Sequence, residues 1–216
     1  HLGAVKAIRK LEAEGIRVIL ASSNALPVVA GVARYSGAEG PVIGETGALL
    51  LYNGKLYRLT ELSAKRARDL VIKELGDLVD EKWHNIFRFH DFAFEVREGR
   101  DPREVVETVR RLLEREGERE VRVGFSGYAI HLTPRDVDKG KGVIKACELL
   151  KIDPKDVVAV GDSVMDVSMF EVVGLSVAVR GGDEEIEEAA DLVTKGEHGE
   201  GFEEIAEKIL KGELWI

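Results

Sequence analysis

Cysteine is almost absent from this 216-residue sequence, which contains only Cys147. A single thiol has no partner for an internal disulfide, so a fold held together by disulfide bonds is excluded. Cys147 lies beside Ala146 and Leu149 in a helical pattern, where it is expected to be a small buried apolar residue. The sequence therefore assigns this cysteine no catalytic role.

Long apolar runs are also missing, although 44% of the residues are hydrophobic. This composition supports a buried core, whereas a membrane-spanning helix would need about 18 or more consecutive apolar residues. The first residues show no basic stretch followed by an apolar stretch and a cleavage site, which a signal peptide would have. We expect a globular, cytoplasmic protein without a membrane partner.

Positive charge is in deficit, because 31 Lys and Arg stand against 40 Asp and Glu and the net formal charge is −9. Proteins that hold a nucleic acid concentrate Lys and Arg on its phosphates, so no nucleic-acid partner is expected. Small anions remain compatible with this charge. The 33% charged content, with one Cys and two Met, is typical of thermophile proteins, and solvated helix faces explain it equally well.

Helical and extended patterns alternate in the first sixty residues. A helical pattern over residues 4–14 precedes the apolar run 18–21, and Asn24 can cap a second helix that tolerates Pro27 in its first turn. Another strand begins at residues 41–43. Asn53-Gly54 between two apolar stretches then predicts a tight hairpin.

The same alternation returns after Pro134. Helices are predicted at residues 141–150, 164–173, 184–190 and 202–211, and strands at 157–160, 176–179 and 192–194. Continuous apolar strands between helices are typical of a doubly wound α/β core with a parallel sheet.

The middle of the chain has a different order. A helix from 62 to 75, strands at 86–89 and 92–96, a helix at 102–115, and strands at 121–125 and 129–132 are predicted. Short connections and alternating strands suit an antiparallel sheet with helices on one face. We therefore expect residues 1–60 and 134–216 to form the core and residues 61–133 to form an inserted αββαββ domain.

Two carboxylates follow the predicted strand 157–160. Asp162 and Asp166 are four residues apart at the start of a helix, where like charges repel unless a cation lies between them. A hard cation such as Mg²⁺ favours carboxylate, water and phosphate oxygens. The alternative is that Asp162 caps the helix and Asp166 complements its dipole.

Two further places where a helix begins carry candidate phosphate ligands. Ser22, Ser23 and Asn24 offer hydroxyls, an amide and backbone N–H groups to an anion, although these are also ordinary turn residues. Lys139 lies between residues 136–138 and a glycine at the start of a helix, where it could neutralise phosphate. Lys141 competes for this role, and spacing does not choose between the two lysines.

Three segments in this order resemble the second, third and fourth motifs of haloacid dehalogenase-type phosphatases. They are Ser22-Ser23-Asn24, Val137-Asp138-Lys139-Gly140 and Gly161-Asp162-Ser163-Val164-Met165-Asp166. The insert lies where members with a C2-type cap carry theirs. Within the superfamily, the chain is similar to the archaeal phosphoglycolate phosphatases over nearly its whole length.

The resemblance implies a role for each candidate residue. Ser22, the amides of Ser23 and Asn24 and the Asn24 side chain would bind the phosphoryl group, and Lys139 would neutralise it. Asp162 and Asp166 would serve a Mg²⁺ site, Asp162 more directly. The implied reaction is hydrolysis of a small phosphomonoester such as 2-phosphoglycolate through an aspartyl phosphate.

The family's first motif, an Asp-x-Asp at the end of a central strand, does not occur at the start of this sequence. We expect that strand and its aspartates upstream of His1, because a sheet without a central strand would leave two rows of backbone groups unpaired. Met165 and Thr46 also depart from the family, since many relatives have Asn at both positions.

Several alternatives stay open at the level of sequence. The substrate could be a sugar phosphate, or the protein could bind phosphate without catalysis or act as a receiver-type signalling domain. Four phenylalanines mark a cap surface, a homodimer contact or the core of the insert: Phe87, Phe89, Phe92 and Phe94. Five polar residues of the insert could select the substrate, but alternating positions on the exposed face of a strand would be polar as well. These residues are Arg88, His90, Asp91, Tyr128 and His131.

Overall fold

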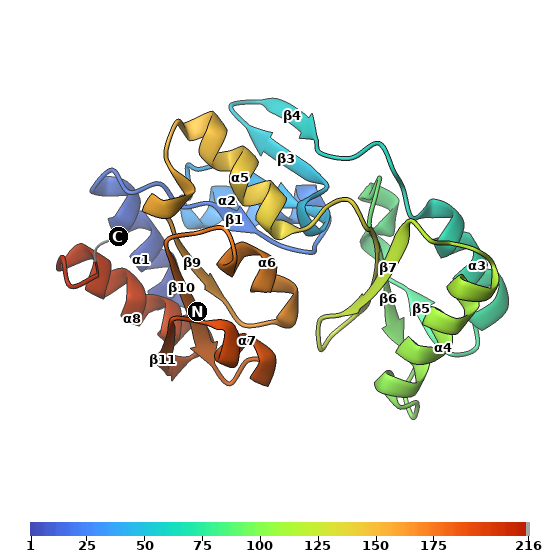
Figure 1. Ribbon diagram of the computed structural model, residues 1–216. Helices are drawn as coiled ribbons and strands as arrows, with labels where there is room; N and C mark the ends of the chain where they lie inside the picture. Colours follow the sequence, from blue (N-terminus) through green and yellow to red (C-terminus); the bar gives the residue numbers. More distant parts are fainter. Residues whose placement is uncertain (215–216) are drawn as a thin grey trace.

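Two stretches of chain that are far apart in sequence build the larger lobe of the computed structural model, which describes residues 1–214 (Figure 1). The first stretch contains α1 (Leu2–Ala13), β1 (Leu20–Ala21), α2 (Leu26–Ser36), β2 (Val42–Gly44), η1 (Glu45–Gly47), β3 (Leu49–Tyr52) and β4 (Lys55–Arg58). The second contains α5 (Lys139–Leu150), η3 (Pro154–Asp156), β9 (Val158–Gly161), η4 (Val164–Asp166), α6 (Val167–Phe170), β10 (Leu175–Arg180), α7 (Glu184–Ala189), β11 (Leu192–Glu197) and α8 (His198–Leu210).

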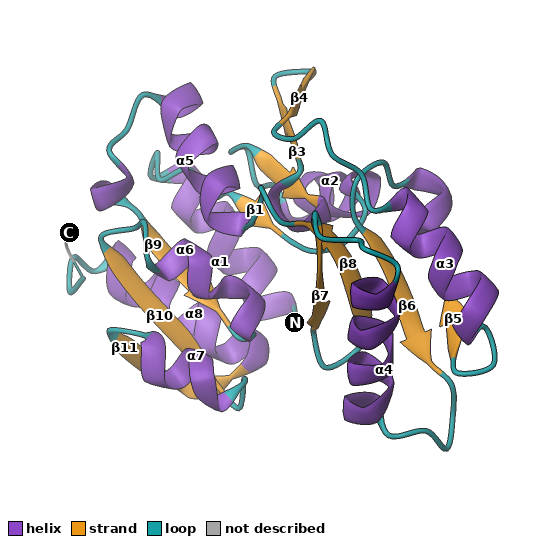
Figure 2. Cartoon of the chain, turned by 45° about the vertical axis from the view of Figure 1, so that its right-hand side comes forward, coloured by secondary structure: helices purple, strands orange, loops and turns teal. Residues whose placement is uncertain are grey.

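The strands of this lobe form two separate sheets. One has the order β1-β2-β3-β4, in which β1 and β2 are parallel and the remaining pairs are antiparallel. The other has the order β11-β10-β9 and is parallel throughout. Helices lie on both faces of the strands, so the predicted α/β class is confirmed (Figure 2).

A cavity of about 880 Å³ lies between the edge strands β1 and β9. Its lining includes Leu20 and Ala21 from β1 and Val158, Ala159 and Val160 from β9. Among residues 1–214, β1 pairs only with β2 and β9 only with β10. Each strand therefore presents one edge without a strand partner to this largely apolar space.

The smaller lobe is an antiparallel sheet covered on one face by two helices (Figure 2). It contains α3 (Lys65–Leu75), β5 (Val79–Glu81), η2 (Trp83–Phe87), β6 (Phe92–Val96), α4 (Pro102–Arg115), β7 (Val121–Phe125) and β8 (Ile130–Pro134), with strand order β5-β6-β8-β7. Val71 of α3 and Val109 of α4 pack against Phe94 and Ile130 in one buried cluster.

Three local predictions were wrong. Residues 86–89 are not a strand, because the Asn85 side chain exchanges two hydrogen bonds of 2.9 and 3.0 Å with the Ala93 backbone and occupies the edge of β6. The helix predicted over 164–173 is two short turns, η4 and α6. Asn24 does not cap α2, whose N-cap is Ala25 without a side-chain bond.

The four phenylalanines divide into two groups. Phe92 and Phe94 are buried in the core of the smaller lobe, whereas Phe87 and Phe89 are exposed. Two of the four phenylalanines therefore belong to the core of the insert, and the other two lie on its surface. No helix within residues 1–214 is both long and apolar enough to cross a membrane.

Candidate active site

The first predicted phosphate-binding segment follows β1. The Ser22 N–H donates to Ile43 O at 3.0 Å, and the Thr46 N–H donates to Ser22 O at 3.3 Å, so this turn is tied to the end of β2. The Ser22 hydroxyl accepts a 3.1 Å hydrogen bond from the Asn24 N–H. Ser22 is half-buried and Asn24 is exposed, so both are accessible to a small anion.

Lys139 and Lys141, which spacing could not separate, have different surroundings. Lys139 is the first residue of α5 and is buried, and its ammonium donates to a carboxylate oxygen of Asp166. Lys141 is exposed and donates to the Asp136 carbonyl. Asp138 caps α5 by accepting from the Lys141 N–H at 2.8 Å. Only Lys139 points inward toward the other predicted residues.

The two predicted metal ligands also differ. Asp166 is buried, and its second oxygen accepts the N–H groups of Asp162 and Ser163, both at 3.2 Å. Ser163 is the N-cap of η4, and Asp166 completes a capping box with it. Asp162 is exposed. The capping alternative therefore applies to Asp166 and Ser163, and not to Asp162.

The carboxylates decide how a metal ion would fit here. No group of three or more His, Cys, Asp or Glu within residues 1–214 is arranged to hold a metal. The Asp166 carboxylate already binds an ammonium and two amides, whereas the exposed Asp162 can offer its oxygens outward. Mg²⁺ commonly takes one or two carboxylates together with phosphate and water. The donors therefore suit Mg²⁺ through Asp162, with Asp166 fixing the turn around it.

Contacts between the three turns bring them to one place. The Ser23 hydroxyl lies 3.8 Å from the Met165 sulfur, which joins the turn after β1 to the turn after β9. The pair of Lys139 and Asp166 joins the start of α5 to the same turn. All three segments that the sequence predicted thus meet beside one another.

The chain also approaches itself closely around α5. Gly47 has a φ of 98°, and a Cβ there would lie 1.9 Å from the Asp138 carbonyl oxygen. Only glycine fits this conformation and this contact. Since Asp138 precedes Lys139, the close approach of η1 helps to set the position of the buried lysine.

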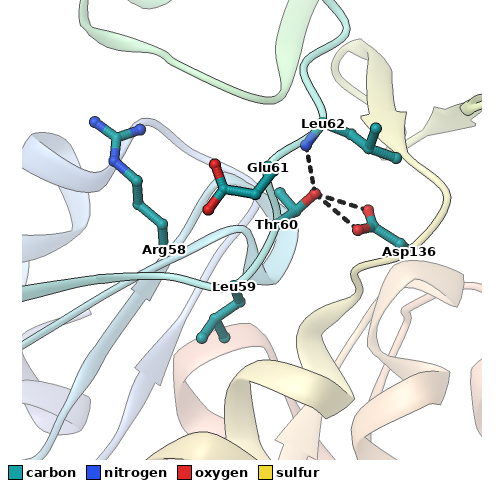
Figure 3. A pocket seen from close by; sticks show the side chains of 6 residues that line it. All are labelled: Arg58, Leu59, Thr60, Glu61, Leu62 and Asp136. Carbon is teal, nitrogen blue, oxygen red and sulfur yellow. Dashed lines mark hydrogen bonds between the residues drawn. The ribbon is translucent and has the colours of Figure 1, made fainter.

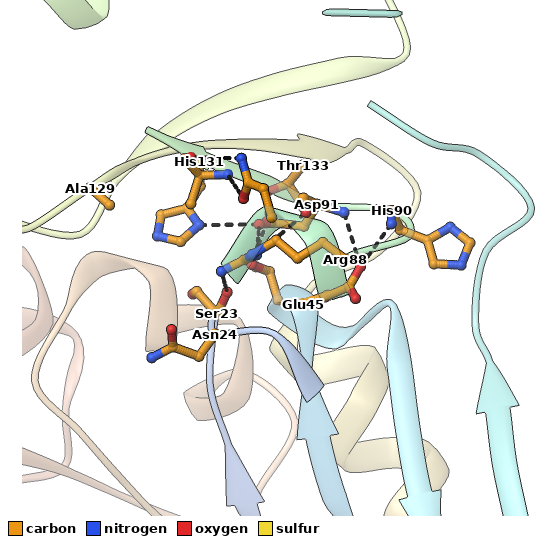
Figure 4. Close-up of polar contacts among 12 residues, drawn as sticks. Ser23, Asn24, Glu45, Arg88, His90, Asp91, Ala129, His131 and Thr133 are labelled. Atoms are coloured by element: carbon orange, nitrogen blue, oxygen red, sulfur yellow. Dashed lines mark hydrogen bonds and ion pairs between the residues drawn. The ribbon is translucent and has the colours of Figure 1, made fainter. Parts of the chain in front are cut away.

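Sequence reasoning gave no role to Glu45, which connects the two lobes (Figure 4). Its fully buried carboxylate accepts the backbone N–H groups of Phe89, His90 and Asp91 from the smaller lobe, with the shortest contact 2.7 Å to His90. Burial raises the pKa of Glu45, while these three hydrogen bonds oppose the rise. Its left-handed φ of 51°, followed by 56° at Thr46, was the structural feature that the sequence did not reveal.

Arg88 and Asp91 form a second connection between the lobes (Figure 4). Both side chains are fully buried and ion-paired, and Arg88 also donates to Ser23 O at 2.8 Å. Asp91 accepts from Thr46 Oγ1 at 2.8 Å and lies 3.2 Å from His131 Nδ1. Burial is the largest influence and raises the pKa of Asp91, but His131 and Arg88 together hold it below its ordinary value.

A hollow of about 540 Å³ lies on the two connecting segments (Figure 3). Thr60 Oγ1 donates to both oxygens of Asp136, at 2.9 and 2.8 Å, and accepts from the Leu62 N–H. The bond between Thr60 and Asp136 joins the chain entering the smaller lobe to the chain leaving it. None of the predicted site residues lines this hollow.

Relatives of known sequence agree over nearly the whole chain. Residues 79–205 match the family model described as haloacid dehalogenase-like hydrolase. The chain is 42% identical to the phosphoglycolate phosphatase of Staphylothermus marinus, over 97% of this chain and 89% of that protein. It is 35% identical to phosphoglycolate phosphatase 1 of Saccharolobus solfataricus, over 99% and 88% of the two chains.

Solved structures share the fold. A crystal structure of a Thermoplasma acidophilum protein matches with a TM-score of 0.82 and 25% identity, over 97% of this chain and 90% of the other. The sucrose-phosphatase of Synechocystis, solved with sucrose and phosphate, matches with a TM-score of 0.77 and 16% identity, over 98% and 91%. With its core, its inserted lobe and these relatives, the chain belongs to the haloacid dehalogenase-like hydrolases and is a phosphatase that resembles the archaeal phosphoglycolate phosphatases.

Proposed function

We propose that this phosphatase hydrolyses 2-phosphoglycolate to glycolate and phosphate in a Mg²⁺-dependent reaction. The observation that carries the proposal is the meeting of the three turns through Ser23 with Met165 and Lys139 with Asp166. A hydroxyl, a buried ammonium and an accessible carboxylate together suit a phosphoryl group and a hard cation. The relatives named as phosphoglycolate phosphatases supply the substrate.

Ser22 and the amides that follow it bind the phosphoryl oxygens in this proposal. Backbone N–H groups at the start of a helix favour anions, and the hydroxyl adds a donor. Lys139 sits behind them and offsets the negative charge that develops during transfer. Bound Mg²⁺, held by Asp162, would supply further charge neutralisation at the phosphoryl oxygens.

The nucleophile in this proposal is an aspartate on a strand between β1 and β9. Support comes from the apolar cavity of about 880 Å³ and from the two strand edges that face it. Its carboxylate oxygen would bond to phosphorus as the bond between phosphorus and the glycolate oxygen breaks, and the second aspartate of the Asp-x-Asp, in its protonated form, would give that oxygen a proton. Water would then attack phosphorus, release phosphate and restore the carboxylate.

Residues 61–133 act as a cap in this proposal. Residues 88–91 of this lobe, between η2 and β6, reach the site through the buried contacts of Glu45 and Arg88. A lobe that covers the site excludes bulk water during phosphoryl transfer. The bond between Thr60 and Asp136 lies at the two connections, where a hinge between the lobes would bend.

The test is phosphate release by the natural full-length protein with Mg²⁺. We expect 2-phosphoglycolate to be hydrolysed faster than a panel of hexose phosphates, and chelation with EDTA to abolish turnover reversibly. Fast turnover of a hexose phosphate beside slow turnover of phosphoglycolate would instead indicate a sugar phosphatase. Binding of phosphate without turnover of any ester would indicate a non-catalytic protein.

The proposed metal ligand has its own test. Asp162→Asn removes charge from an exposed side chain, so we expect folding to be unchanged and the Mg²⁺ concentration for half activation to rise at least about 10-fold. Asp183→Asn provides a control for the turn, because the Asp183 carboxylate accepts the Val164 N–H at 2.7 Å. If both variants change the Mg²⁺ dependence equally, Asp162 is not the ligand.

A further inference from the structure

Arg122 lies on the face of β7 that turns away from the core of the smaller lobe. Side chains alternate along a strand, and Val121, Val123 and Phe125 all pack into the buried cluster of that lobe. Arg122 and Gly124 therefore occupy the opposite face. In the register with β8, Arg122 pairs with Thr133 and Gly124 pairs with His131.

This face is directed at the candidate active site. A Cβ at Gly124 would lie 3.6 Å from Met165 Cε, so β7 passes directly over the turn that carries Asp162 and Asp166. The two β8 partners, Thr133 and His131, both reach Asp91, which in turn binds Thr46 of the larger lobe. The face that bears Arg122 thus forms the boundary between the two lobes.

Arg122 is half-buried and has no partner of its own in the part of the chain that the structure describes. Its side chain takes part in no hydrogen bond or ion pair with residues 1–214, whereas the fully buried side chain of Arg88 binds Asp91 and Ser23 O. Burial lowers the pKa of Arg122 and Arg135 adds to this effect, whereas the nearby carboxylates of Asp138, Asp91 and Asp136 oppose it.

All three carboxylates are already engaged elsewhere, and Asp136 accepts from the Thr60 hydroxyl. Asp138 caps α5 through the Lys141 N–H, and Asp91 is paired with Arg88, His131, Thr133 and Thr46. No Arg122 nitrogen is a buried, unpaired atom within residues 1–214, so the guanidinium is open to an anion that enters between the lobes. The planar fork of arginine matches a carboxylate with two parallel N–H donors.

We propose that Arg122 selects the substrate by binding its carboxylate, while Ser22 and Lys139 hold its phosphoryl group. This inference rests on the proposed function, in which the substrate bears an anion at each end. The phosphoryl end is held by the larger lobe and the carboxylate end by the smaller lobe. Arg122 is therefore a specificity residue that recognises a carboxylate, and a neutral phosphomonoester gains nothing from it.

The experiment compares two substrates of nearly equal shape in the natural full-length protein. 2-Phosphoglycolate carries the carboxylate, and ethyl phosphate has a methyl group in its place. For Arg122→Gln we expect kcat/KM to fall about 10- to 100-fold with phosphoglycolate and to stay within about two-fold with ethyl phosphate. Arg122→Lys should retain part of the preference, because it keeps the charge and loses the fork.

Two further measurements separate recognition from damage to the fold. Glycolate, the product that retains the carboxylate, should inhibit the unaltered protein with ethyl phosphate as substrate, and Arg122→Gln should weaken that inhibition by a similar factor. The melting temperature of Arg122→Gln should not fall, because a cation without a partner is removed. Arg119→Gln is the matched control, since Arg119 is exposed in the same lobe. This variant should leave kcat/KM unchanged for both substrates.

The outcomes distinguish this inference from the proposed function. If the unaltered protein fails to hydrolyse phosphoglycolate, the proposed function is wrong whatever Arg122 does. If it hydrolyses phosphoglycolate, and Arg122→Gln lowers kcat/KM equally for both substrates or for neither, then Arg122 does not recognise the carboxylate. Selective loss with phosphoglycolate and weaker glycolate inhibition support the assignment.

Discussion

Lys139 donates to the Asp166 carboxylate inside the protein, where the two side chains are only 8% and 6% exposed. The lysine begins α5, and the aspartate belongs to the capping box of η4. One ion pair therefore positions the Lys139 ammonium and fixes the turn that presents Asp162. We therefore expect loss of this pair to lower both the stability and the proposed activity of the protein.

Lys139→Met should destabilise the fold by roughly 3–5 kcal/mol, because it leaves the Asp166 charge buried without its cation. Urea unfolding would measure the loss. The exposed Lys141 provides the control, and Lys141→Met should change the free energy of unfolding by less than about 0.5 kcal/mol. Adding Asp166→Asn to Lys139→Met should recover part of the loss, and failure to recover any would contradict the buried-charge explanation.

Arg88→Met should cost roughly 3–5 kcal/mol, because Asp91 and Ser23 O would both lose a buried donor. Loosening Ser23 should also lower kcat, since this residue belongs to the proposed phosphate-binding turn. The matched variant is Arg97→Met in the same lobe, where Arg97 and Asp80 are 47% and 62% exposed. Its cost should stay below about 1 kcal/mol, and equal costs in calorimetry would show that burial does not matter here.

Gly47→Ala should destabilise the protein by more than about 2 kcal/mol, because the new methyl group would collide with the Asp138 carbonyl. Gly54→Ala is the control that separates the cost of this collision from the cost of placing alanine at a positive φ. Gly54 also has a positive φ, but no atom lies within 4 Å of its position, so about 1 kcal/mol is expected. Equal losses of unfolding free energy in the two variants, measured by denaturant titration, would show that the contact with Asp138 does not cause the destabilisation.

Glu204 gives the clearest pH dependence. Its hydrogen bond from Lys208, followed by the N–H groups of Lys195 and Gly196, lowers the pKa of Glu204 to about 2 against partial burial. The ionised carboxylate therefore stabilises the fold fully above its unfolded pKa of about 4.3, and this stability is lost as the pH falls toward 2. Glu204→Gln should cost about 1 kcal/mol at pH 7 and less as the pH approaches 2.

Urea titrations of this variant at pH 7, 4 and 2.5 would follow the change. Glu207→Gln is the control, because the Glu207 side chain is 51% exposed and, within residues 1–214, pairs only with Lys211 at 3.4 Å. It should shift the free energy of unfolding by less than about 0.5 kcal/mol at each pH. A Glu204→Gln deficit that is the same at pH 2.5 and pH 7 would contradict the lowered pKa.

Local patterns in the sequence were enough to predict the α/β class and the place of the candidate residues. Apolar strands followed by polar turns can be recognised from the order of the residues alone. For this reason Ser22, Lys139 and Asp162 could be identified as candidate site residues without a structure. The same patterns misassigned residues 86–89, because a side-chain amide from Asn85 replaces a strand there. The periodicity of apolar residues does not show that a side chain takes the place of a strand.

Only the tertiary structure chose between residues of equal spacing and joined residues that are distant in sequence. Lys139 differs from Lys141 by burial, and Asp166 differs from Asp162 by its bound donors, neither of which is written in the local sequence. Glu45 binds residues 89–91 across 44 to 46 positions of chain. The sequence determined which chemical groups follow each strand, and the packing of two lobes decided which of them meet, because burial and long-range contacts arise only when the chain is folded.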